Sequence, residues 1–306
     1  MSRSRSSHGL VAITVAGVLW GTTGVVVQII RQSADLSPVS VGFYRLAIAA
    51  LALSVFVGRR LRPALRSRPL PLLLIGAGLG AYQALYFIAV AAGGVAVATV
   101  VSLGLAPVLI AGWEAARSRR RPAPAALASI VAAVLGLALI TGFTAAPAGA
   151  APRPLLGLLA AVGSGLGYAI TTVLSRDVGR HVSPLPMAAA TTAIGALALL
   201  PFAVLSDGVT FPVLSAAAGW LAYLGIATTA VAYALLYAGL RTTTGSVAVV
   251  LTLLEPLTAT VLAAAVLGEE LSVAMVTGGG LLLVAVVLAS SRAGVTADRG
   301  SEAAHH

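Results

Sequence analysis

Two ionisable residues, Arg45 and Glu255, lie inside long apolar segments of this chain. Burying either charge in hydrocarbon costs at least about 2.5–3.5 kcal/mol on insertion scales, so each needs a partner, water or a functional role. Glu255 lies ten residues after Gly245, which corresponds to about 15 Å of helix rise and places it near the centre of a bilayer. Glu255 is therefore either a group that binds a proton or a cation, or a structural carboxylate. Arg45 is interpreted as a structural charge that ties its helix to neighbouring carbonyls or to an acidic side chain.

Two prolines, Pro107 and Pro256, lie within other apolar segments. Proline has no backbone N–H and disfavours helical geometry at the residue before it, so each would free a carbonyl within its helix. Freed carbonyls at corresponding places in two repeats are typical of a binding site. Both prolines are therefore predicted to be helix-break or gating positions. A packing kink without a ligand is the alternative.

Aromatic and hydroxyl side chains are the remaining candidates for lining a cavity. Tyrosines occur in two i, i+4 pairs, and each pair shares one helical face that could present rings and hydroxyl groups to a solute. Tyrosine is also common in the interfacial belts of membrane proteins, and threonine bonds to its own helix backbone, so both alternatives stay open. The predicted lining comprises Trp20, Thr23, Tyr82, Tyr86, Tyr168, Thr172, Tyr233, Tyr237 and Glu255.

The sequence does not contain the usual catalytic and metal-binding patterns. The chain has no cysteine, which excludes disulfides, thiolate metal ligands and cysteine nucleophiles. It has no HExxH motif and no paired carboxylates within the apolar segments. The histidines lie in tails or loops, at His8, His181, His305 and His306. We predict no catalytic residue, no metal site and no cofactor, and hence a protein that is not an enzyme.

The elements that carry these residues are predicted from composition and hydropathy. Of the 306 residues, 59% are hydrophobic and 9% are charged, and the mean hydropathy is +1.01. That leaves too little polar surface to cover a water-soluble domain, so the chain is predicted to be an all-α membrane protein with ten transmembrane helices. Segments long enough to cross about 30 Å of hydrocarbon occur at 9–30, 38–57, 70–91, 95–114, 123–142, 155–174, 184–205, 214–239, 245–267 and 272–291.

The arginines predict how these segments are oriented. The chain has no lysine, and its formal charge of +10 comes from an excess of arginine. Sixteen arginines lie in the loops and tails on one side of the predicted membrane, and only Arg31 and Arg153 lie on the other side. The positive-inside rule then places both termini in the cytoplasm, in a multi-pass protein of a bacterial cytoplasmic (inner) membrane. Since topology explains the basic charge, nucleic acid is not predicted as a partner.

The chain contains an internal repeat. Residues 37–56 match residues 183–202 at nine of twenty positions, and glycines, tyrosines and prolines elsewhere recur at similar offsets. The predicted division is a first five-helix repeat at 9–142, a periplasmic linker at 143–154, a second five-helix repeat at 155–291 and a cytoplasmic tail at 292–306. Because five is odd, the second copy must cross the membrane in the opposite direction, which predicts a 5+5 inverted repeat.

Four short segments carry a resemblance to a known family: 19–23 (LWGTT), 43–47 (FYRLA), 254–257 (LEPL) and 267–269 (LGE). In this order, within ten helices and an inverted repeat, they make the chain similar to the drug/metabolite transporter superfamily, specifically its ten-helix EamA-type exporters with two tandem EamA modules. The resemblance implies export of amino acids, other metabolites or toxic compounds through a central cavity. The first half departs from the family pattern, since no acidic residue precedes Pro107 and Glu114 follows Trp113 where a Gly-Glu ending is expected.

The sequence therefore predicts a secondary active transporter of the inner membrane. It is expected to export small metabolites such as amino acids or related compounds by alternating access between two inverted halves, with proton coupling as one option. Its expected partners are a small-molecule substrate and the lipid bilayer. An intramembrane enzyme and a non-transporting membrane receptor are the alternatives.

Overall fold

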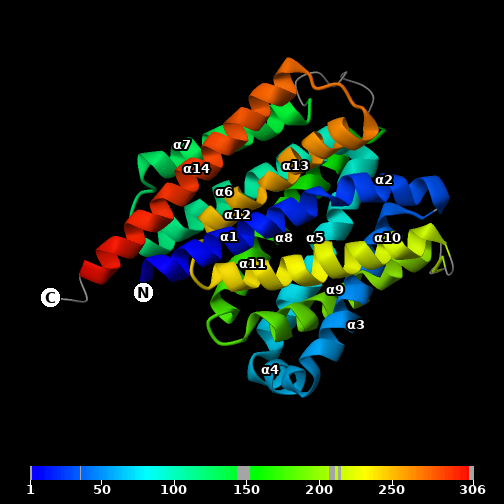
Figure 1. The fold of residues 1–306 in the computed structure, drawn as a ribbon, viewed down its shortest axis with the longest axis horizontal. Helices are drawn as coiled ribbons and strands as arrows, with labels where there is room; N and C mark the ends of the chain where they lie inside the picture. The colour runs from blue at the N-terminus through cyan, green and yellow to red at the C-terminus, as the bar shows by residue number, and fades with distance from the viewer. Residues whose placement is uncertain (1, 35, 143–151, 207–210, 213–214, 303–306) are drawn as a thin grey trace.

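The computed structural model of the chain describes residues 2–34, 36–142, 152–206, 211–212 and 215–302. All regular structure within these ranges is helical, and no strand occurs among them. The helices form one elongated bundle in which segments from both halves of the chain are interleaved (Figure 1). The predicted all-α architecture is confirmed.

The predicted spans are confirmed in number. Within the described ranges, nine helical segments are long and apolar enough to cross a membrane, and Pro124–Ile140 is a shorter apolar helix. The first half contains α1 (Ser2–Gly21), α2 (Thr23–Ser33), α3 (Pro38–Val57), η1 (Gly58–Arg60), α4 (Leu61–Ser67), α5 (Pro69–Gly93), α6 (Val95–Ser118) and α7 (Pro124–Ile140). The second half contains α8 (Pro154–Val178), α9 (Pro184–Ser206), α10 (Ala216–Gly225), η2 (Ile226–Val231), α11 (Ala232–Leu240), α12 (Gly245–Thr252), α13 (Leu254–Leu262), η3 (Ala263–Leu267) and α14 (Val273–Glu302).

Proline marks the start of many of these helices. It occupies the first position of α3, α5, α7, α8 and α9, where its missing N–H is not needed and its fixed φ suits the helix. In α3 the Ser37 hydroxyl also accepts a hydrogen bond from the Ser40 N–H at 3.1 Å, which caps the first turn. The Ser-Pro pair at 37–38 recurs at 183–184 in the repeat, so both copies begin this helix with the same local signal.

The main helix pairs join one half of the chain to the other. Helix α3 packs on α9, α5 on α8, α1 on α11, and α7 on α14. The largest buried cluster takes side chains from both halves, including Leu46, Leu79 and Leu199. Helices α7 and α14 lie side by side at one edge of the bundle (Figure 1), where a Cβ added to Gly136 would come within 2.7 Å of the Gly278 carbonyl oxygen. The two halves therefore share one core.

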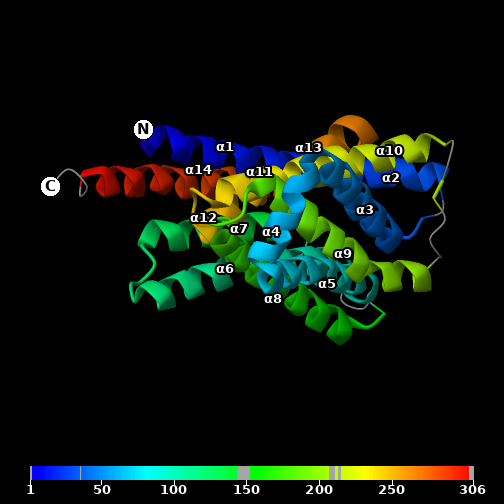
Figure 2. The same ribbon diagram turned by 90° about the horizontal axis from the view of Figure 1, so that it is seen from below.

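The described chain also has the predicted antiparallel relation between its halves. Five spans precede Pro154, so α8 begins at the opposite end of the bundle from α1. The start of α1 and the end of α14 lie at the same end of the bundle in both views (Figures 1 and 2). Helix α14 continues through Glu302, into the predicted tail at 292–306. Of the predicted linker at 143–154, residues 143–151 lie outside the described ranges.

Candidate functional site

Two of the long spans are interrupted near their middle. Helices α1 and α2 are separated at Thr22, whose hydroxyl donates to the Leu19 carbonyl at 2.7 Å. Helices α12 and α13 are separated at Leu253, whose N–H turns back to the Val250 carbonyl at 3.2 Å. Pro256 explains this second interruption, because it has no N–H to donate to the Thr252 carbonyl four residues earlier.

The two interruptions lie against each other, and glycine makes this possible. A Cβ added to Gly21 would lie 2.7 Å from the Glu255 carbonyl oxygen and 2.4 Å from the Thr258 Cβ. One turn earlier, a Cβ added to Gly17 would lie 3.1 Å from the Leu251 carbonyl oxygen. Gly17 and Gly21 are small residues four positions apart, so they share one face of α1. Their lack of side chains lets the α1 backbone contact the α12–α13 junction directly.

Pro107 does not break its helix. Helix α6 runs continuously from Val95 to Ser118 with Pro107 inside it. The predicted pair of matched helix breaks is therefore not present, and the interruption at Pro256 has no equivalent at Pro107. A helix can lose one backbone hydrogen bond to a proline and remain continuous with a bend, because packing against neighbouring helices keeps both parts in place.

The predicted tyrosines from three different helices meet beside these interruptions. The Tyr82 hydroxyl of α5 lies 3.0 Å from the Tyr233 hydroxyl of α11. The Tyr82 ring also lies 5.5 Å from the Tyr168 ring of α8. Trp20 of α1 makes an edge contact with Tyr233, with ring centroids 5.3 Å apart, and Tyr233 is 5.9 Å from Tyr237. Helices from both halves therefore contribute rings to one cluster.

Glu255 belongs to the same neighbourhood. Its carboxylate lies within electrostatic range of Arg45 and of the hydroxyl groups of Tyr86, Tyr168 and Tyr233. The carboxylate is surrounded by protein, yet its side chain keeps partial exposure. It sits in the first turn of α13, where the free N–H groups and helix dipole favour negative charge.

Arg45 is the positive counterpart of this carboxylate. It lies within electrostatic range of the Tyr233 hydroxyl and of Glu255, although no direct ion pair joins the two charged groups in the described structure. Its Nε is buried without a hydrogen-bond partner, as are the Trp20 Nε1 and the Thr23 Oγ1. Buried polar groups are normally satisfied, so three unsatisfied atoms on predicted site residues indicate a place for a polar solute or water.

Two predicted residues have their hydroxyl groups bonded elsewhere. Thr172 donates to the Tyr168 carbonyl of its own helix at 2.8 Å, which is the alternative that the sequence left open. The Tyr86 hydroxyl is 2.9 Å from the Thr99 Oγ1, and its link to the cluster is electrostatic, through Glu255.

The structure adds two threonines that the sequence analysis missed. The Tyr168 hydroxyl is 3.0 Å from the Thr252 Oγ1, at the last residue before the α12–α13 interruption. The Tyr237 hydroxyl is 3.0 Å from the buried Thr191 Oγ1. Thr191 is the repeat equivalent of Arg45, and this correspondence was the available signal for finding it.

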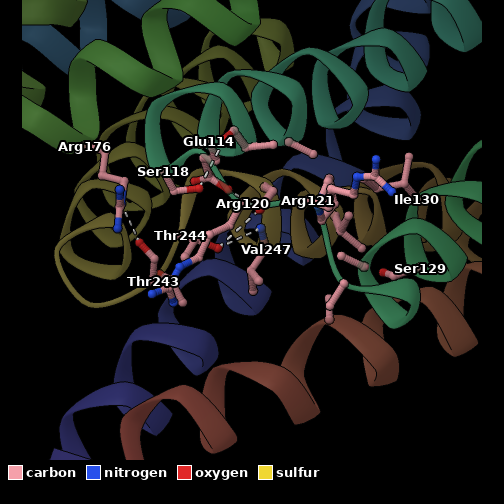
Figure 3. A pocket seen from close by; sticks show the side chains of 18 of the residues that line it. Glu114, Ser118, Arg120, Arg121, Ser129, Ile130, Arg176, Thr243, Thr244 and Val247 are labelled. Carbon is pink, nitrogen blue, oxygen red and sulfur yellow. Dashed lines mark hydrogen bonds between the residues drawn. The ribbon is translucent and has the colours of Figure 1, made fainter. Parts of the chain in front are cut away.

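Two hollows open elsewhere, towards the end of the bundle where most arginines lie, which we call the arginine-rich end. One has a volume of about 590 Å³ and is lined by residues of α6, α7, α8, α12 and α14 (Figure 3). The other, of about 1050 Å³, lies between α3, α4, α9 and α11. Neither lining includes Glu255 or a tyrosine of the cluster.

The apolar spans, the two halves that share one core and the interrupted helices around a buried carboxylate define a multi-pass transporter fold of the inner membrane. A model of the EamA-like transporter family matches the chain twice, at residues 7–142 and 155–291. The chain therefore belongs to the EamA-like transporter family, within the drug/metabolite transporter superfamily.

Individual proteins agree with this assignment. The chain is 31% identical over 224 residues to the uncharacterized transporter YwfM of Bacillus subtilis (strain 168), covering 72% of this chain and 73% of that protein. It is 29% identical over 201 residues to the uncharacterized inner membrane transporter YicL of Salmonella typhimurium, covering 63% and 66% of the two chains. One crystal structure superposes with a TM-score of 0.78 at 22% identity, covers 94% of this chain and 98% of its own, and shows the same fold.

Proposed function

We propose that this family member is a secondary active transporter that exports amino acids or related small metabolites by alternating access. The observation that carries the proposal is that Glu255, at the α12–α13 interruption, and Arg45 of α3 lie within electrostatic range without forming an ion pair in the described structure, beside unsatisfied donors on Trp20 and Arg45. Opposite charges held apart near mid-membrane match a solute that carries both an amine and an acidic group. The membership of the chain in a transporter family supports the general class.

The proposed substrate pose follows from the charges. The substrate amine would face the Glu255 carboxylate, and the rings of Tyr82 and Tyr168 would stack near that cation. The substrate acid would face Arg45, whose guanidinium binds carboxylates with paired donors. The Trp20 Nε1, which has no partner now, would supply another donor.

Alternating access would arise from the two inverted repeats, 9–142 and 155–291, moving relative to each other about this site. The linker at 143–154 would connect them on the periplasmic side. Glu255 would be neutralised alternately by a proton and by the substrate amine, since leaving a bare carboxylate in the membrane is costly. Proton entry from the periplasm would then drive substrate exit.

The proposal is tested with purified full-length protein in proteoliposomes. Radiolabelled amino acids would be screened for counterflow and for flux driven by an imposed pH gradient. The variant Glu255→Gln should reduce gradient-driven flux at least about tenfold, because a charged contact is worth roughly 1.5–3 kcal/mol. The matched control Glu269→Gln makes the same chemical change at an exposed residue outside the site, and it should leave flux unchanged.

Two outcomes would contradict the proposal. Full gradient-driven flux in Glu255→Gln would remove this residue from coupling. Absence of counterflow with every amino acid and related zwitterion, under conditions in which the protein is folded, would reject the substrate class.

A further inference from the structure

The 590 Å³ hollow at the arginine-rich end is separate from the proposed transport site. It is lined by Arg120 and Arg121, which follow α6, and by Arg176, near the end of α8 (Figure 3). The first two come from the first half of the chain and the third from the second half. Three guanidinium groups thus surround one concavity at the junction between the halves.

The acidic residue in this lining, Glu114, pairs with none of these arginines in the described structure and offsets one of their three charges. Glu114 lines the same hollow, but both of its oxygens are committed to the start of α12 (Figure 3). Oε1 accepts from the Gly245 N–H at 2.8 Å, and Oε2 accepts from the Ser246 hydroxyl at 2.5 Å. Of the arginines, Arg176 donates its Nε to the Thr243 carbonyl at 2.9 Å. Within the described residues none of the three arginines makes an ion pair, so the hollow keeps an excess of positive charge.

Part of the lining of the hollow is apolar. Ile130 of α7, Val247 and Val250 of α12 and Ala289 of α14 line it. The helices α7 and α14, which contribute to this lining, also form an edge of the bundle where apolar residues such as Val131 and Val287 are 56% and 61% exposed. In a bilayer this edge is covered by acyl chains. The hollow therefore has arginines on its rim and lies next to a surface that faces lipid.

We propose that this hollow binds an anionic phospholipid, with its phosphate at the arginine rim and an acyl chain along α7 and α14. Guanidinium groups bind phosphate oxygens through paired donors, and basic pockets at this level of a membrane protein suit anionic headgroups. A positive-inside bias alone requires arginines on this side of the membrane. It does not require three of them around one apolar-walled hollow. The bound lipid ties α6 to α8 and so holds the two halves together at this end.

The test uses the full-length protein in detergent, with thermal unfolding and lipid binding as readouts. Phosphatidylglycerol should raise the melting temperature and bind saturably, whereas zwitterionic phosphatidylcholine should do neither. The double variant Arg120→Gln/Arg121→Gln should weaken phosphatidylglycerol binding at least about tenfold, because two charged contacts are lost. The control Arg59→Gln/Arg66→Gln removes the same charge from exposed residues outside both hollows and should bind normally.

A second variant tests the site without changing charge. Ala126→Leu adds volume inside the hollow and should also reduce binding, which keeps the test valid if the arginine variant folds poorly. Equal stabilisation by glycerol phosphate or inorganic phosphate would overturn the lipid assignment and indicate a free-anion site. Equal effects of phosphatidylcholine, or equal loss in the Arg59/Arg66 control, would reject a specific site.

Discussion

Glu255 and Arg45 illustrate how this membrane bundle tolerates charge near its centre. The carboxylate gains from the first-turn N–H groups of α13 and from the positive charge of Arg45. The guanidinium in turn lies within electrostatic range of the Tyr233 hydroxyl. The sequence identified both residues but interpreted Arg45 as structural only. In our proposal it also faces the substrate.

The coupling between these charges is measurable with a double-mutant cycle. Arg45→Gln alone should destabilise the protein, because it leaves the Glu255 carboxylate without its counter-charge. The double variant Arg45→Gln/Glu255→Gln should recover part of that loss, with a coupling free energy of about 0.5–3 kcal/mol. Chemical unfolding in mild detergent gives the four stabilities. Strictly additive losses would show that the two charges do not interact.

At the scale of elements, close backbone contact sets the position of the helix interruptions. Helix α1 can reach the α12–α13 junction only because Gly17 and Gly21 have no side chains. The same device joins α5 to α9, where a Cβ added to Gly80 would lie 2.8 Å from the Gly195 carbonyl oxygen. Small residues therefore determine which helices can approach closely, and larger side chains fill the remaining contacts.

Two glycines three residues apart provide a matched test of this packing. Gly21→Ala should destabilise the protein by about 1–3 kcal/mol through overpacking against Thr258 and the Glu255 carbonyl. Gly24→Ala meets nothing within 4 Å, and it should be neutral or stabilise by up to about 1 kcal/mol. Thermal unfolding and transport should both distinguish the two variants. Equal behaviour of the two variants would contradict the close approach of α1 to α13.

At the scale of the whole molecule, the order of the spans and the distribution of arginine define the orientation. The start of α1 and the end of α14 lie at the same end of the bundle (Figures 1 and 2), and by the order of the spans this is the arginine-rich end. The positive-inside rule predicts that this end faces the cytoplasm. That orientation would place the proposed anionic-lipid hollow in the inner leaflet. It would also place the first turn of α12, to which Glu114 is hydrogen-bonded, on the cytoplasmic side.

The absence of cysteine from the sequence allows a direct test of orientation. Single cysteines would be introduced as Ser67→Cys at the arginine-rich end and Glu270→Cys at the opposite end, both at exposed positions. In intact spheroplasts a membrane-impermeant maleimide should label Glu270→Cys only, and it should label Ser67→Cys after lysis. The reverse pattern would invert the proposed topology.

The sequence by itself determined the spans, the helix starts and the repeat, since hydropathy, N-terminal prolines and recurrent motifs are local properties. It also singled out Glu255 and the tyrosines, because a charge or a ring within an apolar run is visible without a fold. Only the tertiary structure decided that Pro256 interrupts its helix while Pro107 does not. Only the tertiary structure shows that Thr252 lies beside Tyr168 and that the Glu114 carboxylate accepts a hydrogen bond from the first residue of α12. These contacts join residues 84 and 131 positions apart, and such pairings depend on how whole helices pack.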